Sequence, residues 1–272
     1  EAPEMGLLKV DQSGNIKEFV EKPKDSSVIE RFKAPDSLFG TQKRTNNPDL
    51  CLASMGVYVF KPNVLEKVLS DRDKTDFGKE IIPLSIHKYK VMAYPFLDYW
   101  KDIGTIAAFF EANIDLAQPQ PPFRLYEPKW PIYTHQRSLP PSRVIHSEIR
   151  DSLLVEGSDI DGAHIEDSII GVRSIVRKNT HLKEVVMMGA DFYEGEQVLG
   201  VRKSSARNTP PLGIGKNCMI RRAIIDKNVC IGDDVIIRSK EGMKDSKGKT
   251  HWIRDGITII PKGTVIPSGT VI

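Results

Sequence analysis

Single aliphatic residues recur every five or six positions through the second half of the chain, between small residues, Gly, Asp and Asn. This spacing matches neither the 3.6-residue period of a helix nor the two-residue period of a strand. It is typical of a triangular coil whose flat sides each turn one aliphatic side chain inward, with each coil stacked on the next. We therefore predict an all-β parallel β-helix over residues 143–272. The three series are Ile149, Leu154, Ile160, Ile165, Ile170, Ile175; then Ile214, Ile220, Ile225, Ile231, Ile236; then Ile259, Val265, Val271.

Corner residues of such a coil must accept positive φ. The segments 213–217 (Gly-Ile-Gly-Lys-Asn) and 226–233 (Asp-Lys-Asn-Val-Cys-Ile-Gly-Asp) carry residues of that kind. Unrelated short strands in a sandwich are the alternative, which three separate series of similar period disfavour.

The first 118 residues mix strands and helices. Leu7–Val10 and Ile16–Val20 flank a turn-rich joint, which predicts a hairpin. The apolar run Met55–Phe60 predicts a strand buried on both faces. Apolar residues at helical spacing predict a short helix after Pro62 and a longer one from Ile106 to Ala117. The proline-rich segment 119–142 reads as an extended linker.

Composition narrows the function classes. Hydrophobic residues make up 40% of the chain and charged residues 28%, which excludes wholesale disorder. No apolar run approaches the roughly 20 residues that span a bilayer, so a membrane partner is not expected. The net charge of +3 is small and scattered, so no nucleic-acid partner is expected. Cys51, Cys218 and Cys230 lie far apart and are predicted to be buried thiols.

Two places carry residues suited to sugar-phosphate chemistry. Glu21 and Lys22 stand at the end of a predicted strand, where α/β folds place ligand contacts. The ammonium group of Lys22 can neutralise a phosphate, and the carboxylate of Glu21 can accept sugar hydroxyls. Asp102 precedes the longer helix and suits either an N-cap or a Mg²⁺ ligand. The chain contains no glycine-rich phosphate loop.

Several motifs occur together in one order along the whole chain, and with them the sequence resembles the glucose-1-phosphate adenylyltransferase (ADP-glucose pyrophosphorylase) family, closest to its plant and cyanobacterial type. The resemblance implies a partial, Rossmann-like α/β nucleotidyltransferase domain over residues 1–118, the linker, and a left-handed parallel β-helix over 143–272. The motifs are Phe19–Lys24, Ala53–Tyr58, Asp76–Pro83, Tyr99–Thr105, Pro131–Thr134, Met188–Asp191 and Arg222–Asn228.

The same resemblance implies the reaction of ATP with glucose 1-phosphate to ADP-glucose and pyrophosphate, with Mg²⁺, in glycogen or starch synthesis. It assigns Glu21, Lys22 and Ser54 to glucose 1-phosphate and Asp102 to the metal, and it predicts that Lys22 and Asp102 act in catalysis and meet in one cleft. The family's glycine-rich loop, base pocket and first metal aspartate have no counterpart here. We therefore expect an N-terminally truncated chain, without an ATP cradle and inactive alone.

Regulation is implied as well. Lys227 and Lys262 match family lysines that bind anionic effectors, with 3-phosphoglycerate activating and inorganic phosphate inhibiting. Arg137 and His135 match another anion-binding patch. The family also implies a homo- or heterotetramer, in the cytoplasm of a bacterium or the plastid of a plant or alga.

Two features keep alternatives open. Lys101 stands where the family commonly has Glu, which suits a non-catalytic regulatory subunit of the same heterotetramer. Histidines in the repeat would suit a hexapeptide-repeat acyltransferase, which leaves the Glu-Lys-Pro and Trp-Lys-Asp motifs unexplained; they are His146, His164 and His181. Other sugar nucleotidyltransferases share the general plan, although the linker and repeat motifs favour the adenylyl type.

Overall fold

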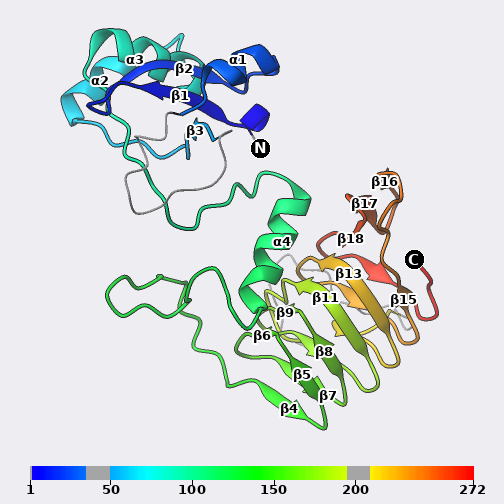
Figure 1. Ribbon diagram of the computed structural model, residues 1–272. Coiled ribbons are helices and arrows are strands. Elements are labelled where there is room, and N and C mark those ends of the chain that lie inside the picture. Colours follow the sequence, from blue (N-terminus) through cyan, green and yellow to red (C-terminus); the bar gives the residue numbers. More distant parts are fainter. Residues whose placement is uncertain (1, 35–49, 195–208) are drawn as a thin grey trace. The chain divides into compact units, whose positions relative to one another are not determined.

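The computed structural model describes residues 2–34, 50–194 and 209–272 (Figure 1). The chain forms two compact units, Glu1–Asp98 and Tyr99–Ile272. Among the described residues, no helix has both the length and the apolar character needed to cross a membrane.

A three-stranded sheet in the order β2-β1-β3 organises the first unit. Strands β1 and β2 form the predicted hairpin, closed by Asp11, whose carboxylate accepts the backbone N–H groups of Ser13 and Asn15. The strands are β1 (Gly6–Val10), β2 (Ile16–Glu21) and β3 (Leu52–Ala53). The helices are η1 (Ala2–Glu4), α1 (Ser26–Arg31), α2 (Pro62–Leu69), the π-helical turn η3 (Phe77–Ile81) and α3 (Ile82–Lys88).

The predicted strand over Met55–Phe60 is wrong. Only Leu52 and Ala53 pair with β1, and the following residues run as irregular backbone. Val57 is 74% exposed and Val59 98% exposed, whereas Tyr58 and Phe60 turn toward the ring of Phe77. An apolar run forms a buried strand only where neighbours pair with it and cover both faces, and no described residue does so here.

The second unit contains helix α4 (Ile106–Ala117) and a β-helix. Short strands stack in parallel to form two sheets, and β16 and β17 add an antiparallel edge to one of them (Figure 1). One sheet contains β4 (Arg143–Ile145), β7 (Asp159–Asp161), β10 (Ile175–Val176), β12 (Gly213–Ile214), β14 (Cys230–Ile231) and β19 (Val265–Ile266). The other contains β5 (Glu148–Arg150), β6 (Leu153–Leu154), β8 (His164–Glu166), β9 (Ile169–Ile170), β11 (His181–Met187), β13 (Met219–Ile225), β15 (Ile236–Ile237), β16 (Ser246–Lys247), β17 (Trp252–Arg254) and β18 (Ile257–Ile260).

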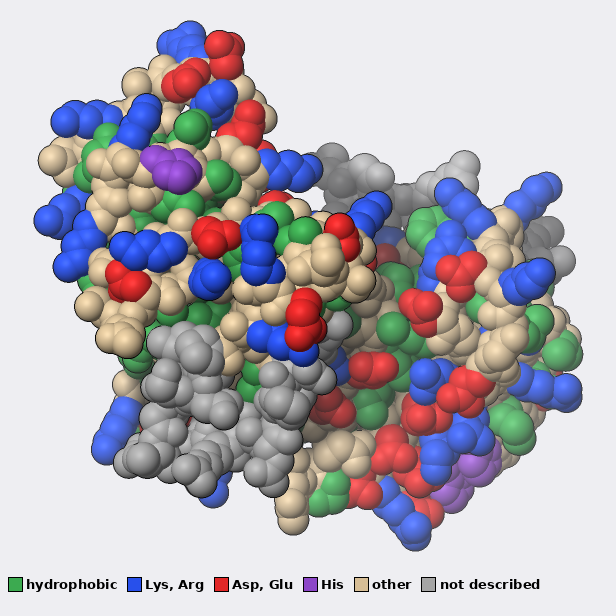
Figure 2. Space-filling view, turned by 45° about the horizontal axis from the view of Figure 1, so that its top comes forward, with side chains coloured by type: hydrophobic (Ala, Val, Ile, Leu, Met, Phe, Trp, Pro, Cys, Tyr) green, Lys and Arg blue, Asp and Glu red, His purple; other side chains and the backbone are tan. Residues whose placement is uncertain are grey.

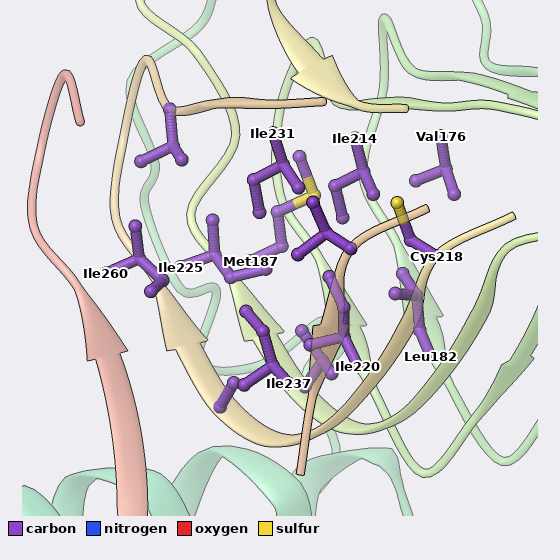
Figure 3. Packing of buried hydrophobic residues seen from close by; sticks show 14 of the residues in the cluster. Val176, Leu182, Met187, Ile214, Cys218, Ile220, Ile225, Ile231, Ile237 and Ile260 are labelled. Carbon is purple, nitrogen blue, oxygen red and sulfur yellow. The ribbon is translucent and has the colours of Figure 1, made fainter. Parts of the chain in front are cut away.

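Inward aliphatic side chains form three columns inside the β-helix (Figure 3). The predicted periodicity is confirmed, but each series ends one residue out of phase. The side chains in the inner core are Val176, Ile237, Ile260, Ile266 and Ile272, one position after the predicted Ile175, Ile236, Ile259, Val265 and Val271. Ile259 is buried too, at 8% exposed, but it packs in a second apolar cluster outside these columns. Two adjacent aliphatic residues stand at each of these places, and strand alternation turns only one of them inward. Spacing by itself does not distinguish the two.

The corners of the coils use positive φ as predicted. Within the two predicted corner segments, Gly213 has φ 91°, Asn217 φ 55° and Asn228 φ 62°. Asn and Asp tolerate this conformation better than other residues with a Cβ, so the corner residues allow consecutive coils to keep the same register.

Helix α4 packs on the outside of the β-helix. Phe110, which is 2% exposed, forms a second apolar cluster with Ile224 and Ile257, and the guanidinium group of Arg222 lies 5.3 Å from the centre of its ring. The helix therefore belongs to the second compact unit. Residues 119–142, all of them described, contain neither helix nor strand.

Only one of the three cysteines is fully buried. Cys218 is 1% exposed, whereas Cys51 and Cys230 are half-buried, so the prediction of three buried thiols is corrected for these two. On the face shown in Figure 2, the described acidic and basic side chains are interspersed rather than arranged in a basic stripe.

Candidate functional site

Glu21 and Ser54 lie at the same end of the first unit's sheet, on either side of Gly6. Gly6 begins the middle strand β1 and pairs with Glu21 on β2, while its carbonyl oxygen accepts the backbone N–H of Ser54 at 2.7 Å. The order β2-β1-β3 thus brings together two residues that are far apart in the sequence.

The carboxylate of Glu21 packs against the backbone of the turn η3. A Cβ atom on Gly78 would lie 2.6 Å from Glu21 Oε2. Such a distance is incompatible with any side chain unless Glu21 moves. Gly78, part of the motif Asp76–Pro83, therefore leaves the space that the carboxylate of Glu21 occupies.

Lys22 follows Glu21 at the strand end with a φ of 47°, and its backbone N–H donates to the carbonyl oxygen of Met5 at 3.1 Å. This turn leaves the Lys22 side chain exposed. The hydroxyl of Ser54 lies 3.2 Å from that of Tyr58, whose ring stacks on Phe77 at a centroid distance of 5.9 Å. Three residues that bear a carboxylate, an ammonium and a hydroxyl group thus stand at one end of the sheet, a combination suited to a polar ligand that carries a phosphate.

Asp102 belongs to the second unit, and its meeting with Lys22 stays a prediction. Its carboxylate accepts the backbone N–H of Gly104 at 3.0 Å and is exposed. The N-cap alternative for Asp102 is wrong, because Thr105 caps α4 by accepting the N–H of Ala108 at 3.1 Å.

Lys101 turns its charge toward helix α4. Its ammonium group lies 3.0 Å from Glu111 and 3.8 Å from Asp115, and no ion pair among the described residues joins it to Asp102. Burial opposes its charge, but the hydrogen bond to Glu111 and the charges of Glu111 and Asp115 prevail and raise the pKa of Lys101. The substituted residue therefore adds no uncompensated charge beside Asp102.

The described residues include no group of three or more His, Cys, Asp or Glu side chains that could hold a metal ion. Mg²⁺, however, is commonly bound through one or two carboxylates together with substrate phosphates. An exposed carboxylate such as that of Asp102 fits one ligand of this kind.

The predicted effector residues meet in the second unit, around a pocket of about 400 Å³. His135 and Arg137 reach it from the linker segment, and Lys227 from a coil corner. Lys262 adjoins them, because both Lys262 and Lys227 lie 2.8 Å from the carboxylate of Asp191. The structure therefore brings His135 and Arg137 of the linker together with Lys227 and Lys262, which are far from them in the sequence.

Asp191 is the carboxylate shared by these lysines. Its hydrogen bonds with Lys227 and then Lys262 hold the pKa of Asp191 well below its usual range, against the effect of partial burial. In return, the hydrogen bond to Asp191 raises the pKa of Lys262. The raised pKa favours the charged form of Lys262.

The pocket lies along one corner of successive coils. Ala190 donates its N–H to Val172, Asn228 to Gly189, and Gly263 to Lys227. Arg173, Asp191, Lys227 and Lys262 therefore follow one another from coil to coil. A phosphate-sized anion suits such a group of Lys and Arg side chains, since their hydrogen bonds to it are charge-assisted.

Sequence reasoning missed Arg173 and did not assign Asp191 a role. Arg173 lines the pocket and donates to the carbonyl oxygen of Ala190 at 3.3 Å. The signal in the sequence is an Arg at a corner position of the repeat, where Gly, Asn or Asp is usual; the structure gives this Arg a φ of 56°.

Comparison with known protein families gives two matches. Residues 1–119 match the nucleotidyl transferase family, and residues 137–271 match the GLGC left-handed parallel β-helix domain. The first match covers the Glu-Lys-Pro and Trp-Lys-Asp motifs, which an acyltransferase would leave unexplained. The second gives the handedness of the coil.

Proposed function

Because the chain belongs to the glucose-1-phosphate adenylyltransferase family, we propose that it serves adenylyl transfer from ATP to glucose 1-phosphate, which gives ADP-glucose and pyrophosphate for glycogen or starch synthesis. The general activity, nucleotidyl transfer to a sugar phosphate, follows from the pair of matched domains. What we propose is the identity of the two substrates, namely the base of the nucleotide and the sugar.

The observation that carries the proposal is the gathering of Glu21, Lys22 and Ser54 at one end of the sheet. A hexose phosphate needs a cation for its phosphate and polar groups for its hydroxyls. Lys22 supplies the first as an ammonium group. Glu21 and Ser54 supply the polar groups for the sugar hydroxyls. The carboxylate of Glu21 accepts hydrogen bonds, and the hydroxyl of Ser54 both donates and accepts them.

In the proposed reaction, an oxygen of the sugar phosphate attacks the α-phosphorus of ATP, and the bond to the leaving pyrophosphate breaks. Such transfers are accelerated mainly by positioning and by neutralising charge. Lys22 holds the attacking phosphate and offsets its charge. Asp102 would hold Mg²⁺, which supplies further charge neutralisation when bound.

We further propose that residues 1–272 by themselves bind the sugar phosphate but do not complete the transfer, because they contain no glycine-rich loop for the triphosphate. The pocket with Arg137, His135, Lys227 and Lys262 is proposed to bind anionic effectors such as 3-phosphoglycerate or phosphate. A tetramer, implied by the family, is proposed as the assembled form.

A non-catalytic regulatory subunit is the second candidate. This alternative rests on the presence of Lys101 next to Asp102, the proposed metal ligand. Since Glu111 and Asp115 compensate the charge of Lys101, we favour the catalytic role.

Calorimetric titration of the 272-residue chain with glucose 1-phosphate tests the proposal. We expect Lys22→Ala to weaken binding by about 10- to 100-fold, as for loss of a charge-assisted contact of about 1.5–3 kcal/mol. Lys24→Ala is the matched control, an exposed lysine two positions along, and should bind like the parent. Equal affinity of the Lys22→Ala and parent chains would overturn the sugar-phosphate site. Synthesis of ADP-glucose by this chain alone would refute the missing-cradle argument.

A further inference from the structure

The segment that carries Asp102 has no helix or strand of its own. Residues 99–105 run as irregular backbone up to the cap of α4. The carboxylate of Asp102 accepts one hydrogen bond from within this segment, from Gly104. The orientation of Asp102 therefore depends on what ties the segment to the rest of the second unit.

Lys101 provides such a tie. Its side chain is only 25% exposed and reaches Glu111 at 3.0 Å and Asp115 at 3.8 Å. Glu111 and Asp115 are four residues apart on α4 and so lie on one face of the helix, where two carboxylates repel each other. The Lys101 ammonium lies between these charges and relieves the repulsion, so the contact stabilises both partners.

Helix α4 is in turn fixed to the β-helix. Phe110, on the same helix, is 2% exposed and packs against Ile224 and Ile257. The path from Asp102 through Lys101 to α4 and the β-helix runs within one compact unit.

We propose that Lys101 is a positioning residue for Asp102: by binding Glu111 and Asp115 it fixes the adjacent carboxylate in the orientation that receives a divalent cation. The inference rests on the proposed role of Asp102 as a metal ligand. It assigns to the unusual lysine a role in this chain that glutamate at the same position would not perform, since a third carboxylate would be repelled by Glu111 and Asp115.

Mn²⁺ binding to the 272-residue chain in the presence of saturating glucose 1-phosphate, whose phosphate supplies the further oxygen ligands of such a site, tests this. Binding is measured by the loss of the free-ion signal in electron paramagnetic resonance. We expect Lys101→Met to weaken Mn²⁺ binding by about 10-fold or more, the range seen when groups that orient a metal ligand are removed. Lys101→Arg should retain most of the affinity. The charge swap Lys101→Glu with Glu111→Lys should recover part of what Lys101→Glu alone loses.

Lys183→Met is the matched control. Lys183 is likewise paired with two carboxylates, Glu166 at 2.7 Å and Asp167 at 3.9 Å, but on the β-helix. It should leave Mn²⁺ binding unchanged. Hydrogen exchange of residues 99–105 should rise in Lys101→Met and not in Lys183→Met.

The variant Asp102→Asn separates the two levels of the proposal. If it binds Mn²⁺ as the parent does, or if the parent binds none, the metal role of Asp102 fails and the inference fails with it. If Asp102→Asn weakens binding while Lys101→Met does not, only the positioning role is overturned. If both weaken it and the double variant is no weaker than Asp102→Asn alone, Lys101 acts through Asp102.

Discussion

The ammonium group of Lys227 lies 2.8 Å from the carboxylate of Asp191. The carboxylate of Asp191 thereby contacts the same cationic side chains that a bound anion would contact. Any effector that binds this pocket must share these cations with Asp191 or displace it from them.

Asp191→Asn should therefore strengthen the binding of inorganic phosphate. The amide keeps the shape of the side chain but removes the competing charge, and exposed ion pairs of this kind contribute about 0.2–1 kcal/mol each. We expect an affinity gain of about two- to tenfold in a phosphate titration. Glu166→Gln, which alters the ion pair with Lys183 elsewhere on the coil, should change nothing. Weaker binding in Asp191→Asn would contradict the competition.

The same residue should make stability depend on acid pH. The pKa of Asp191 is lowered in the fold by Lys227 and then Lys262, below the value of about 3.9 for an unfolded chain. A lowered folded-state pKa stabilises the fold above the unfolded value, and this contribution is lost as the pH falls through the folded pKa. The side chain is 37% exposed, so screening by solvent keeps the effect below about 1 kcal/mol.

Urea unfolding of the parent and of Asp191→Asn at pH 7 and pH 2.5 measures this. The parent should be the more stable protein at pH 7, and the difference should shrink at pH 2.5. If the difference in the free energy of unfolding between the two proteins grows at pH 2.5, Asp191 does not stabilise the fold in the way proposed.

The phase of the core columns predicts different costs for two adjacent isoleucines. Ile237 is 1% exposed inside the β-helix, whereas Ile236 is half-buried. Ile237→Ala should lower the free energy of unfolding by about 2–5 kcal/mol, as for a buried Ile truncated to Ala. Ile236→Ala has the same change of composition and should cost clearly less. Equal losses in chemical denaturation would mean that both side chains contribute to the core.

The β-helix could be predicted from the sequence because its signal is repeated many times. One aliphatic residue for each side of a coil is enough to establish the period, and residues such as Asn217 and Asn228 establish the corners. Phase could not be predicted where two aliphatic residues are adjacent. The prediction of a buried strand over Met55–Phe60 is wrong for a different reason. Burial of a strand depends on neighbouring strands and covering residues, and a local apolar pattern does not show whether these are present.

Removing the space beside Glu21 should weaken sugar-phosphate binding. Gly78→Ala would place a Cβ atom 2.6 Å from Glu21 Oε2, so the carboxylate must move. A displacement of about 1 Å can cost up to about 100-fold in function, and we expect a loss of about tenfold or more in affinity for glucose 1-phosphate. Lys79→Ala, an exposed neighbour on the same turn, should bind normally. Unchanged affinity of Gly78→Ala would separate Glu21 from the ligand.

Cys218 should resist thiol reagents in the folded protein. It is 1% exposed, and burial raises the pKa of its thiol, so little thiolate is present at neutral pH. Labelling followed by peptide mass analysis should find Cys218 modified only after unfolding. Rapid labelling of Cys218 in the native chain would contradict its place in the core.

The members of the candidate site could be predicted only where a motif resembled a known one. Nothing in the local sequence of Lys227 or Arg137 shows that they meet, since stacking of the coils and the path of the linker bring them together. Asp191 and Arg173 were missed as functional residues because an acidic residue and a corner arginine have many ordinary explanations. Their roles depend on neighbours from other coils.

The positions of Arg173, Asp191, Lys227 and Lys262 on consecutive rungs also limit how this chain can change in length. Neighbouring strands are about 4.8 Å apart, so inserting or deleting one full turn between Arg173 and Lys262 would move one charge by about the width of a phosphate group. Natural variants that gain or lose a turn should do so outside this interval, because between Arg173 and Lys262 the number of turns sets the distances between the charged side chains.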